Sequence, residues 1–287
     1  EKNHVVVVDD LSTGYLENIQ DLVEGRKIDF VKGSITDCNL LQDVFRGCDF
    51  VFHQAALASV PRSIKDPVQT NLVNVQGTVN VLVAAKDCSV RKVLFASSSS
   101  VYGDTPTLPK TEAMAPNPLS PYAVSKLAGE YYCQVFSRVF QLPVVALRYF
   151  NVYGPSQDPS SEYAAVIPRF ITSVMKGVSP VVYGDGEQTR DFTFIADVIQ
   201  ANIRAAESSA TGVFNAAAGG SISLNALAQS VMSICKKQLP IVYEAARPGD
   251  IKHSFADSSK AKKAFGYEPT YDIQKGLQGT IVWYQKQ

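Results

Sequence analysis

Residues 66–100 read "DPVQTNLVNVQGTVNVLVAAKDCSVRKVLFASSSS", a helical pattern that runs into a strand pattern. Asp66 is a favourable N-cap, and Pro67 suits the first helical position because its missing N–H would have no partner there. The apolar run that follows is typical of a parallel strand buried on both faces. A helix that leads into such a strand predicts an α/β fold.

The same alternation extends along the chain in both directions. Further strand patterns are "HVVVVDD" (4–10), "KIDFVKG" (27–33), "CDFVFHQAA" (48–56) and "LPVVALRYFN" (142–151). A second long helix is expected to begin with Ser120 as cap and Pro121 as first residue. Strands and helices that alternate in this way predict a doubly wound, Rossmann-like parallel sheet.

After about residue 150 the alternation loosens. "VSPVVYGDGEQTRDFTF" is typical of strand, turn and strand, and "FIADVIQANIRAAE" of a helix. We therefore predict a Rossmann-like domain in residues 1–150, rejoined by about 187–215. Residues 151–186 and 216–287 are predicted to form a second, smaller α+β domain.

The composition narrows the class of protein. Of 287 residues, 27 are basic and 27 acidic, so the net charge is zero and nothing favours nucleic-acid binding. The apolar runs are far shorter than the roughly 20 residues of a membrane span. The five cysteines are scattered without a C-x-x-C pair. They predict reduced thiols in a cytoplasmic protein, and no metal site.

Asp9 closes the first strand pattern, "VVVVDD". In dinucleotide-binding domains an acidic residue ends the second strand and bonds a ribose, about 20 residues after a glycine-rich turn. A charged strand end is the simpler reading of Asp9 alone. If Asp9 is the ribose acid, we expect roughly 30 native residues upstream of Glu1, including a first strand and the glycine loop. This chain would then bind the cofactor weakly.

The stretch "LSPYAVSKLAGEYY" (119–132) places Tyr122 and Lys126 one helical turn apart, on one face. A second pair with the same spacing, Tyr271 and Lys275, is best interpreted as the exposed start of the last helix. The spacing alone therefore decides nothing, and the surrounding motifs must identify the functional pair.

Those motifs include "DDLSTG", "HQAALASVPRS", "ASSSSVYGD", "SPYAVSK", "RYFNVYGP", "YAAVIPRF", "GDGEQTRDF" and "RPGDIKHS". With them, the whole chain resembles the extended short-chain dehydrogenase/reductase family. Within that family it is similar to nucleotide-sugar 4-epimerases, nearest to those for UDP-N-acetylglucosamine. The resemblance implies NAD as cofactor in the first domain and a UDP-sugar substrate in the second. It also implies a homodimer formed through a four-helix contact that includes the Tyr122 helix.

The resemblance implies three catalytic residues: Tyr122, Lys126 and Ser98. A free tyrosine has a pKa of about 10, too high for a base at neutral pH. A lysine one turn away favours the phenolate, which can then take a proton from the sugar 4-hydroxyl. Ser98, near the end of its strand, is expected at the carboxyl edge of the sheet, where it would bond the reacting 4-oxygen.

Other site residues are carried over by the same resemblance. The cofactor contacts implied are Asp9, Ser12, Gly14, Ser34, Ile35, Gln54, Ala55, Ala56, Asn74 and Tyr149, besides Tyr122 and Lys126. The substrate contacts implied are Ser98, Ser99, Ser100, Asn151, Val166, Tyr183, Arg190, Arg247, Asp250 and Ser254. Ser34 departs from the family, because many relatives carry an acid there. Planar guanidinium groups such as those of Arg190 and Arg247 suit a diphosphate.

The expected reaction oxidises C4 to a ketone, turns the sugar over and reduces it from the other face. Ser254 is small where some enzymes specific for plain hexoses have tyrosine, so UDP-GlcNAc and UDP-GalNAc are expected as the main pair. UDP-glucose and UDP-galactose remain possible substrates, and a 4-epimerase of N-acetylated uronic acids is an alternative. A dehydratase is disfavoured because "SSSSVYG" contains no acid. A non-catalytic dinucleotide-binding protein is the remaining alternative.

Overall fold

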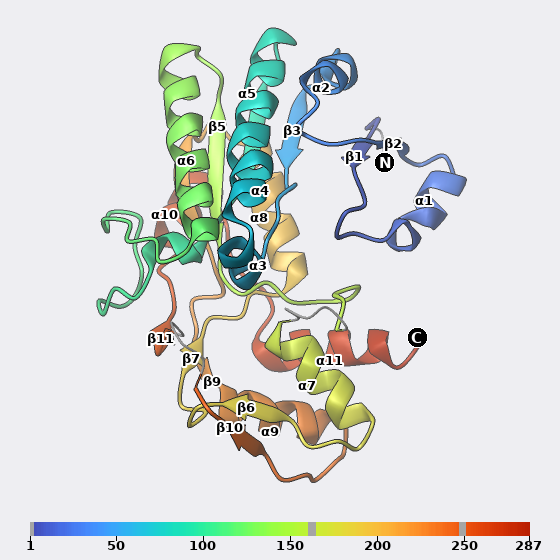
Figure 1. Cartoon of the computed structure of the whole chain (residues 1–287), viewed down its shortest axis with the longest axis vertical. Helices are drawn as coiled ribbons and strands as arrows, with labels where there is room; N and C mark the ends of the chain where they lie inside the picture. Colours follow the sequence, from blue (N-terminus) through green and yellow to red (C-terminus); the bar gives the residue numbers. More distant parts are fainter. Residues whose placement is uncertain (1–2, 160–164, 247–250) are drawn as a thin grey trace. The chain divides into compact units, whose positions relative to one another are not determined.

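The computed structural model describes residues 3–159, 165–246 and 251–287 (Figure 1). The chain divides into two compact units. The first unit contains the chain up to Ser97 together with Ser120–Ala146, and the second contains Ser98–Leu119 and the chain from Leu147 onward. The predicted 187–215 stretch belongs to the second unit. The assignment of one ligand to each domain stays a prediction.

The main sheet confirms the predicted α/β class. Its strands are β3 (Phe50–His53), β4 (Lys92–Ser98), β5 (Val144–Tyr149) and β8 (Gly212–Ala216), in the order β3-β4-β5-β8. β3 and β4 pair in parallel, with Phe50 opposite Lys92. β4 is almost fully buried, which explains its continuous apolar run.

Two long helices lie side by side in the first unit, α5 (Gly77–Asp87) and α6 (Pro121–Val139) (Figure 1). The predicted caps are confirmed: Ser120 accepts from the N–H of Ala123 at 3.1 Å, and Asp66 from that of Gln69 at 2.9 Å. The helix that Asp66 caps is less regular than predicted. It consists of α4 (Pro67–Asn71), the π-helix η2 (Leu72–Gln76) and then α5.

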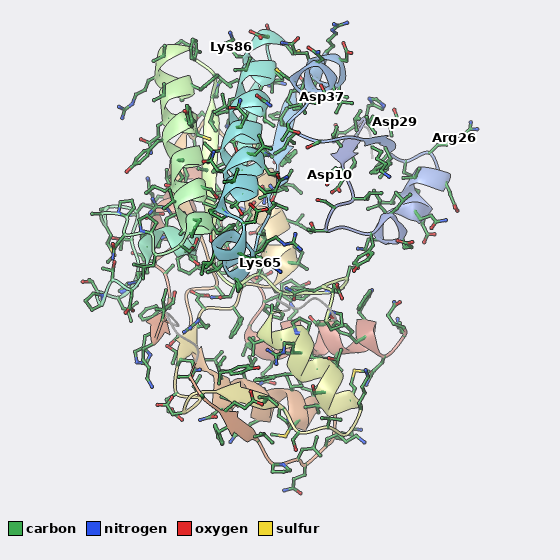
Figure 2. All side chains as sticks on the ribbon, viewed as in Figure 1. Asp10, Arg26, Asp29, Asp37, Lys65 and Lys86 are labelled. Carbon is green, nitrogen blue, oxygen red and sulfur yellow. The ribbon has the colours of Figure 1, made fainter. Side chains whose placement is uncertain are left out.

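The N-terminal strand pairs outside the main sheet. β1 (Val6–Asp9) and β2 (Asp29–Lys32) form a separate parallel ribbon, with Val6 opposite Asp29. Polar side chains order the turns around this ribbon. Asp10 accepts from the N–H of Ser12 at 2.9 Å, and Asp37 caps α2 (Cys38–Phe45) (Figure 2). The remaining elements of the first unit are η1 (Leu16–Asn18), α1 (Gln20–Glu24) and α3 (Val60–Lys65).

The second unit is an α+β arrangement and contains more of the chain than the first. Its helices are η3 (Ser99–Tyr102), α7 (Val166–Met175), α8 (Ile195–Glu207), α9 (Leu224–Ile234), α10 (Ser259–Phe265) and α11 (Ile273–Tyr284). Its further strands are β6 (Val181–Tyr183), β7 (Thr189–Arg190), β9 (Ile222–Ser223), β10 (Val242–Glu244) and β11 (His253–Ser254). They form the sheets β11-β7-β9 and β10-β6, so the predicted strand, turn and strand are confirmed. Phe170, Phe194 and Leu227 belong to its apolar core.

No helix among the described residues is long and apolar enough to cross a membrane. All five cysteines are free thiols. Within the described ranges, no three histidine, cysteine, aspartate or glutamate side chains are grouped so that they could hold a metal ion.

Candidate active site

Helix α6 holds the predicted Tyr122–Lys126 pair against the end of β4. The Lys126 ammonium nitrogen is 5.9 Å from the centre of the Tyr122 ring, so the predicted neighbourhood is present. It donates a hydrogen bond of 2.8 Å to the carbonyl of Ala96, two residues before the end of β4. The same nitrogen lies 5.2 Å from the centre of the Phe95 ring. Lys126 is 4% exposed, so this ammonium is solvated by the protein.

Burial controls the charges in this region. It lowers the pKa of Lys126 to about 8, so the side chain is largely an ammonium ion at neutral pH and loses its proton just above. His53, on β3, is also buried. Burial, assisted by the nearby Lys126 charge, lowers the pKa of His53 to about 3, so this imidazole is neutral. The local cation is therefore Lys126.

Gly129 lets α6 approach β4 closely. A Cβ placed on Gly129 would lie 2.4 Å from Cζ of Phe95 and 3.0 Å from Cε1. Phe95 is fully buried, so its ring has little room to move. A side chain at position 129 would separate the helix from the strand, and with it the Lys126 ammonium from the Ala96 carbonyl.

The predicted cofactor residue Asn74 lies in η2, and its amide bonds to the protein. Its oxygen accepts from the N–H of Leu57 at 2.8 Å. Its nitrogen donates to the Leu57 carbonyl at 3.2 Å and to the Ser125 hydroxyl at 3.0 Å. Asn74 therefore holds the segment after β3 against α6. Gln54 and Ala55, at the start of that segment, are exposed, and Ala56 is half-buried.

Asp9 lies at the carboxyl end of β1, as expected for a ribose-binding acid. One carboxylate oxygen accepts from the N–H of Leu11 at 2.7 Å. A Cβ on Gly14 would be 3.8 Å from both carboxylate oxygens, so the turn that also contains Ser12 passes close to the acid. An exposed carboxylate with one oxygen engaged can accept bonds from vicinal hydroxyls. This hydrogen-bond acceptor fits the hydroxyls of the adenosine ribose of NAD.

Ser34 and Ile35 follow β2 in the same part of the chain. The hydroxyl of Ser34 accepts from the N–H of Thr36 at 3.2 Å and from its hydroxyl at 2.9 Å. Ile35 is 7% exposed. A Cβ placed on Gly77 would lie only 2.5 Å from Cδ1 of Ile35, so the two residues are in close contact. Ile35 thus packs the loop that follows β2 against the start of α5.

In the second unit, Ser98 begins the serine segment. Its hydroxyl oxygen accepts from the N–H of Ser100 at 3.1 Å and so caps η3, whose first residue is Ser99. The hydroxyl of Ser100 is buried and has no partner among the residues that the structure describes. Tyr102 anchors this short helix: its hydroxyl donates to Asn215 at 2.7 Å. The serine segment is therefore held in a fixed conformation.

Several predicted substrate residues meet in the second unit. Ser254 on β11 pairs with Arg190 on β7. Asn151 donates from its amide to the carbonyl of Asp191 at 2.9 Å. These residues come from three separate segments, which meet at β7 and at Asp191, the residue that follows it.

Other predicted residues lie apart from that group. Val166 is the first residue of α7, and Tyr183 ends β6. The hydroxyl of Tyr149 bonds the amide of Asn202 on α8. Arg247 and Asp250 lie outside the described residues.

Two further residues of this region are not predicted by the sequence. Asp191, fully buried, accepts from the N–H groups of Ala218, Gly219 and Ala256 at 3.0, 3.1 and 3.2 Å. Burial raises the pKa of its carboxyl to about 7, against the opposing effect of these bonds. Arg169 on α7 places its guanidinium 5.4 Å from the centre of the Tyr183 ring. Only their positions inside the quoted "YAAVIPRF" and "GDGEQTRDF" motifs marked them.

The second Tyr–Lys pair lies at the start of α11, as expected. The Lys275 ammonium is 4.2 Å from the centre of the Tyr271 ring, and Asp272 between them caps the helix. Lys275 is exposed, in contrast to the buried Lys126. Burial therefore separates the two pairs, although their spacing is the same.

The sequence and fold of this chain are similar to those of known proteins. Residues 1–217 match the profile of the "NAD dependent epimerase/dehydratase family". The chain is 36% identical over 286 residues to the putative UDP-glucose 4-epimerase of Methanocaldococcus jannaschii. The aligned residues make up 99% of this chain and 91% of that protein.

Solved structures are similar over nearly the whole chain. The UDP-N-acetylglucosamine 4-epimerase of Methanobrevibacter ruminantium M1, in complex with UDP-N-acetylmuramic acid, has a TM-score of 0.96 and 40% identity, with 99% of this chain and 91% of that one covered. The UDP-glucose 4-epimerase of Thermotoga maritima, with UDP-glucose, has a TM-score of 0.95 and 34% identity, with 99% and 92% covered.

Proposed function

Because this chain belongs to the NAD dependent epimerase/dehydratase family, we propose that it is an NAD-dependent 4-epimerase of a UDP-sugar. The observation that carries the proposal is the buried Lys126 ammonium one turn from Tyr122, bonded to the carbonyl of Ala96 at the end of β4. The relatives described as 4-epimerases support the same reaction class.

In this proposal Tyr122 takes the proton of the 4-hydroxyl. The Lys126 ammonium favours the phenolate form of Tyr122 because it is a fixed positive charge in a desolvated place. NAD, when bound, supplies the hydride acceptor at C4 and then returns the hydride. Ser98 donates its hydroxyl hydrogen to the 4-oxygen, because its oxygen is already an acceptor in the η3 cap. Asp9 bonds the adenosine ribose.

The second unit is proposed to bind the UDP group. Arg190 faces the diphosphate, and Tyr183 packs against the uracil. Ser254, paired with Arg190 in the register of β11 and β7, is proposed to leave room for an acetamido group. UDP-GlcNAc and UDP-GalNAc are therefore the proposed main pair.

We also propose that two copies form a homodimer in the cytoplasm. Helix α6 carries an outward row of exposed apolar side chains, Val124, Tyr131, Val135 and Val139. Val68 and Leu72 are exposed as well, on α4 and η2, and both of these elements contact α6. A contiguous apolar surface of this kind marks a protein interface. A second copy of the same surface is self-complementary in a two-fold dimer.

The experiment that tests the function measures turnover of UDP-GlcNAc, UDP-glucose and an N-acetylated UDP-uronic acid with added NAD. Interconversion of UDP-GlcNAc and UDP-GalNAc is expected, with a transient absorbance near 340 nm. Tyr122→Phe should abolish turnover. Full turnover by a folded Tyr122→Phe protein would contradict the proposed mechanism.

Ser254→Tyr tests the sugar preference separately. If Ser254 makes room for the acetamido group, the tyrosine should remove most UDP-GlcNAc turnover and spare UDP-glucose. Undiminished turnover of UDP-GlcNAc would show that residue 254 does not select the sugar. Preferred turnover of the uronic acid would favour the alternative substrate class.

A further inference from the structure

A chain of buried hydrogen bonds runs through the first unit towards Tyr122. Nε2 of His53 lies 2.8 Å from the hydroxyl of Thr78, which donates to the carbonyl of Asn74 at 2.6 Å. A threonine has one hydroxyl hydrogen, and Asn74 receives it. His53 must therefore donate to Thr78 from Nε2–H. Since burial keeps this imidazole neutral, the direction of the chain is fixed at this end.

The chain continues through the Asn74 side chain. The side-chain oxygen of Asn74 accepts a hydrogen bond from the N–H of Leu57. Its nitrogen donates one hydrogen bond to the carbonyl of Leu57 and another to the hydroxyl of Ser125. Ser125 in turn donates its hydroxyl hydrogen to the carbonyl of Tyr122 at 2.7 Å. Asn74 and Ser125 are each 3% exposed, so water cannot replace these partners. A buried and fully paired polar network of this kind fixes one arrangement of its members.

The π-helix is the part of the backbone that places Asn74 in this network. η2 lies between α4 and α5, and it packs against α6. A π-turn widens the helix by one residue and changes the direction of the side chains it contains. Such turns occur frequently at functional sites. Here the turn directs the amide of Asn74 towards Ser125 and Leu57.

The first turn of α6 needs such support. Tyr122 is the second residue of the helix, after Pro121, in the turn whose N–H groups have no intrahelical partner. The Ser120 cap serves the N–H of Ala123. The Ser125 bond adds a second constraint, on the carbonyl of Tyr122 itself.

We propose that Ser125 is a positioning residue for Tyr122, held in turn by Asn74 of the π-helix. This inference rests on the proposed function, in which Tyr122 is the base. Without the Ser125 hydroxyl, the first turn of α6 loses its link to η2, and the phenol shifts relative to the Lys126 ammonium. A misplacement of about 1 Å at a reacting group can cost about a hundredfold in rate, so a shift of about half an ångström is expected to cost about tenfold.

The test compares three single variants with the unmodified protein. Ser125→Ala should lower kcat for UDP-GlcNAc by about tenfold and leave KM nearly unchanged. Ser125→Thr keeps the hydroxyl and should restore most of kcat. Ser63→Ala is the matched control, because Ser63 is equally buried and its hydroxyl also donates to a carbonyl three residues earlier, that of Val60. It should leave kcat unchanged.

A second readout does not depend on turnover. Absorbance near 295 nm follows ionisation of the Tyr122 phenol when a Tyr122→Phe protein supplies the baseline. Ser125→Ala should move the midpoint of this titration to higher pH, because the phenol lies less favourably beside the ammonium. Ser63→Ala should not move it.

The outcomes separate this inference from the proposed function. A folded Ser125→Ala protein with normal kcat and an unchanged midpoint would overturn the positioning role, even if Tyr122→Phe is inactive. Full turnover by Tyr122→Phe would instead overturn the proposed function, and the positioning role with it. If Ser125→Ala does not fold, Thr78→Val removes the hydroxyl further along the chain and is judged by the same two readouts.

Discussion

Replacing Gly129 by alanine tests the close approach of α6 to β4. The new Cβ would lie 2.4, 3.0 and 3.2 Å from three atoms of the Phe95 ring. Carbon atoms pack at about 3.5–4.0 Å, so the ring or the helix must move by roughly 1 Å. Overpacking of this kind costs about 1–3 kcal/mol, and alanine regains up to about 1 kcal/mol of helix propensity. We expect a net loss of about 1–2 kcal/mol.

Thermal unfolding measures this loss. For a chain of this size, 1 kcal/mol corresponds to roughly 2–4 °C in Tm, so Gly129→Ala should lower Tm by about 2–8 °C. Turnover should also fall, because the shift separates the Lys126 ammonium from the Ala96 carbonyl. Gly279→Ala is the control: Gly279 lies in α11, and a Cβ there would meet Phe194 at an ordinary 3.7 Å. It should raise Tm slightly. A Gly129→Ala protein as stable as this control would refute the packing argument.

Three further predictions follow from the site. Burial lowers the pKa of Lys126 to about 8, so its side chain is an ammonium ion below that pH. We expect kcat to fall as the pH rises through about 8, and a pH–rate profile measures this. Asp191→Ala leaves three N–H groups without their acceptor. That of Ala256 is buried and that of Gly219 lies at an exposed residue, so thermal unfolding should show a loss of about 1–3 kcal/mol and calorimetry a weaker affinity for UDP. Val135→Asp places a charge in the proposed dimer interface, and light scattering should then find monomers where the unmodified protein forms dimers.

Local signals in the sequence predicted the regular parts of the fold. The caps at Asp66 and Ser120 depend on side chains that bond within their own turn, so residue type and position suffice. Strand β4 is buried on both faces, and its continuous run of apolar residues predicts this burial. The Tyr122–Lys126 proximity follows from helical spacing, once the helix is known.

Contacts between distant segments could not be predicted in the same way. The π-turn in η2 has no composition of its own, because it depends on how Asn74 meets Leu57 and Ser125. Lys126 differs from Lys275 in being buried, and the spacing of residues in the sequence does not predict burial. Asp191 resembled an ordinary charged residue beside Arg190. Its role appears only when the chain brings three remote N–H groups to one carboxylate.

That carboxylate joins segments that have little else in common. Ala218 and Gly219 follow β8 and Ala256 follows β11, yet all three N–H groups donate to the carboxylate of Asp191. Breaking any one of these three hydrogen bonds destabilises the other two. Hydrogen–deuterium exchange should therefore find one common opening free energy for the three amides, so that the loops after β8 and β11 behave as a single cooperative unit.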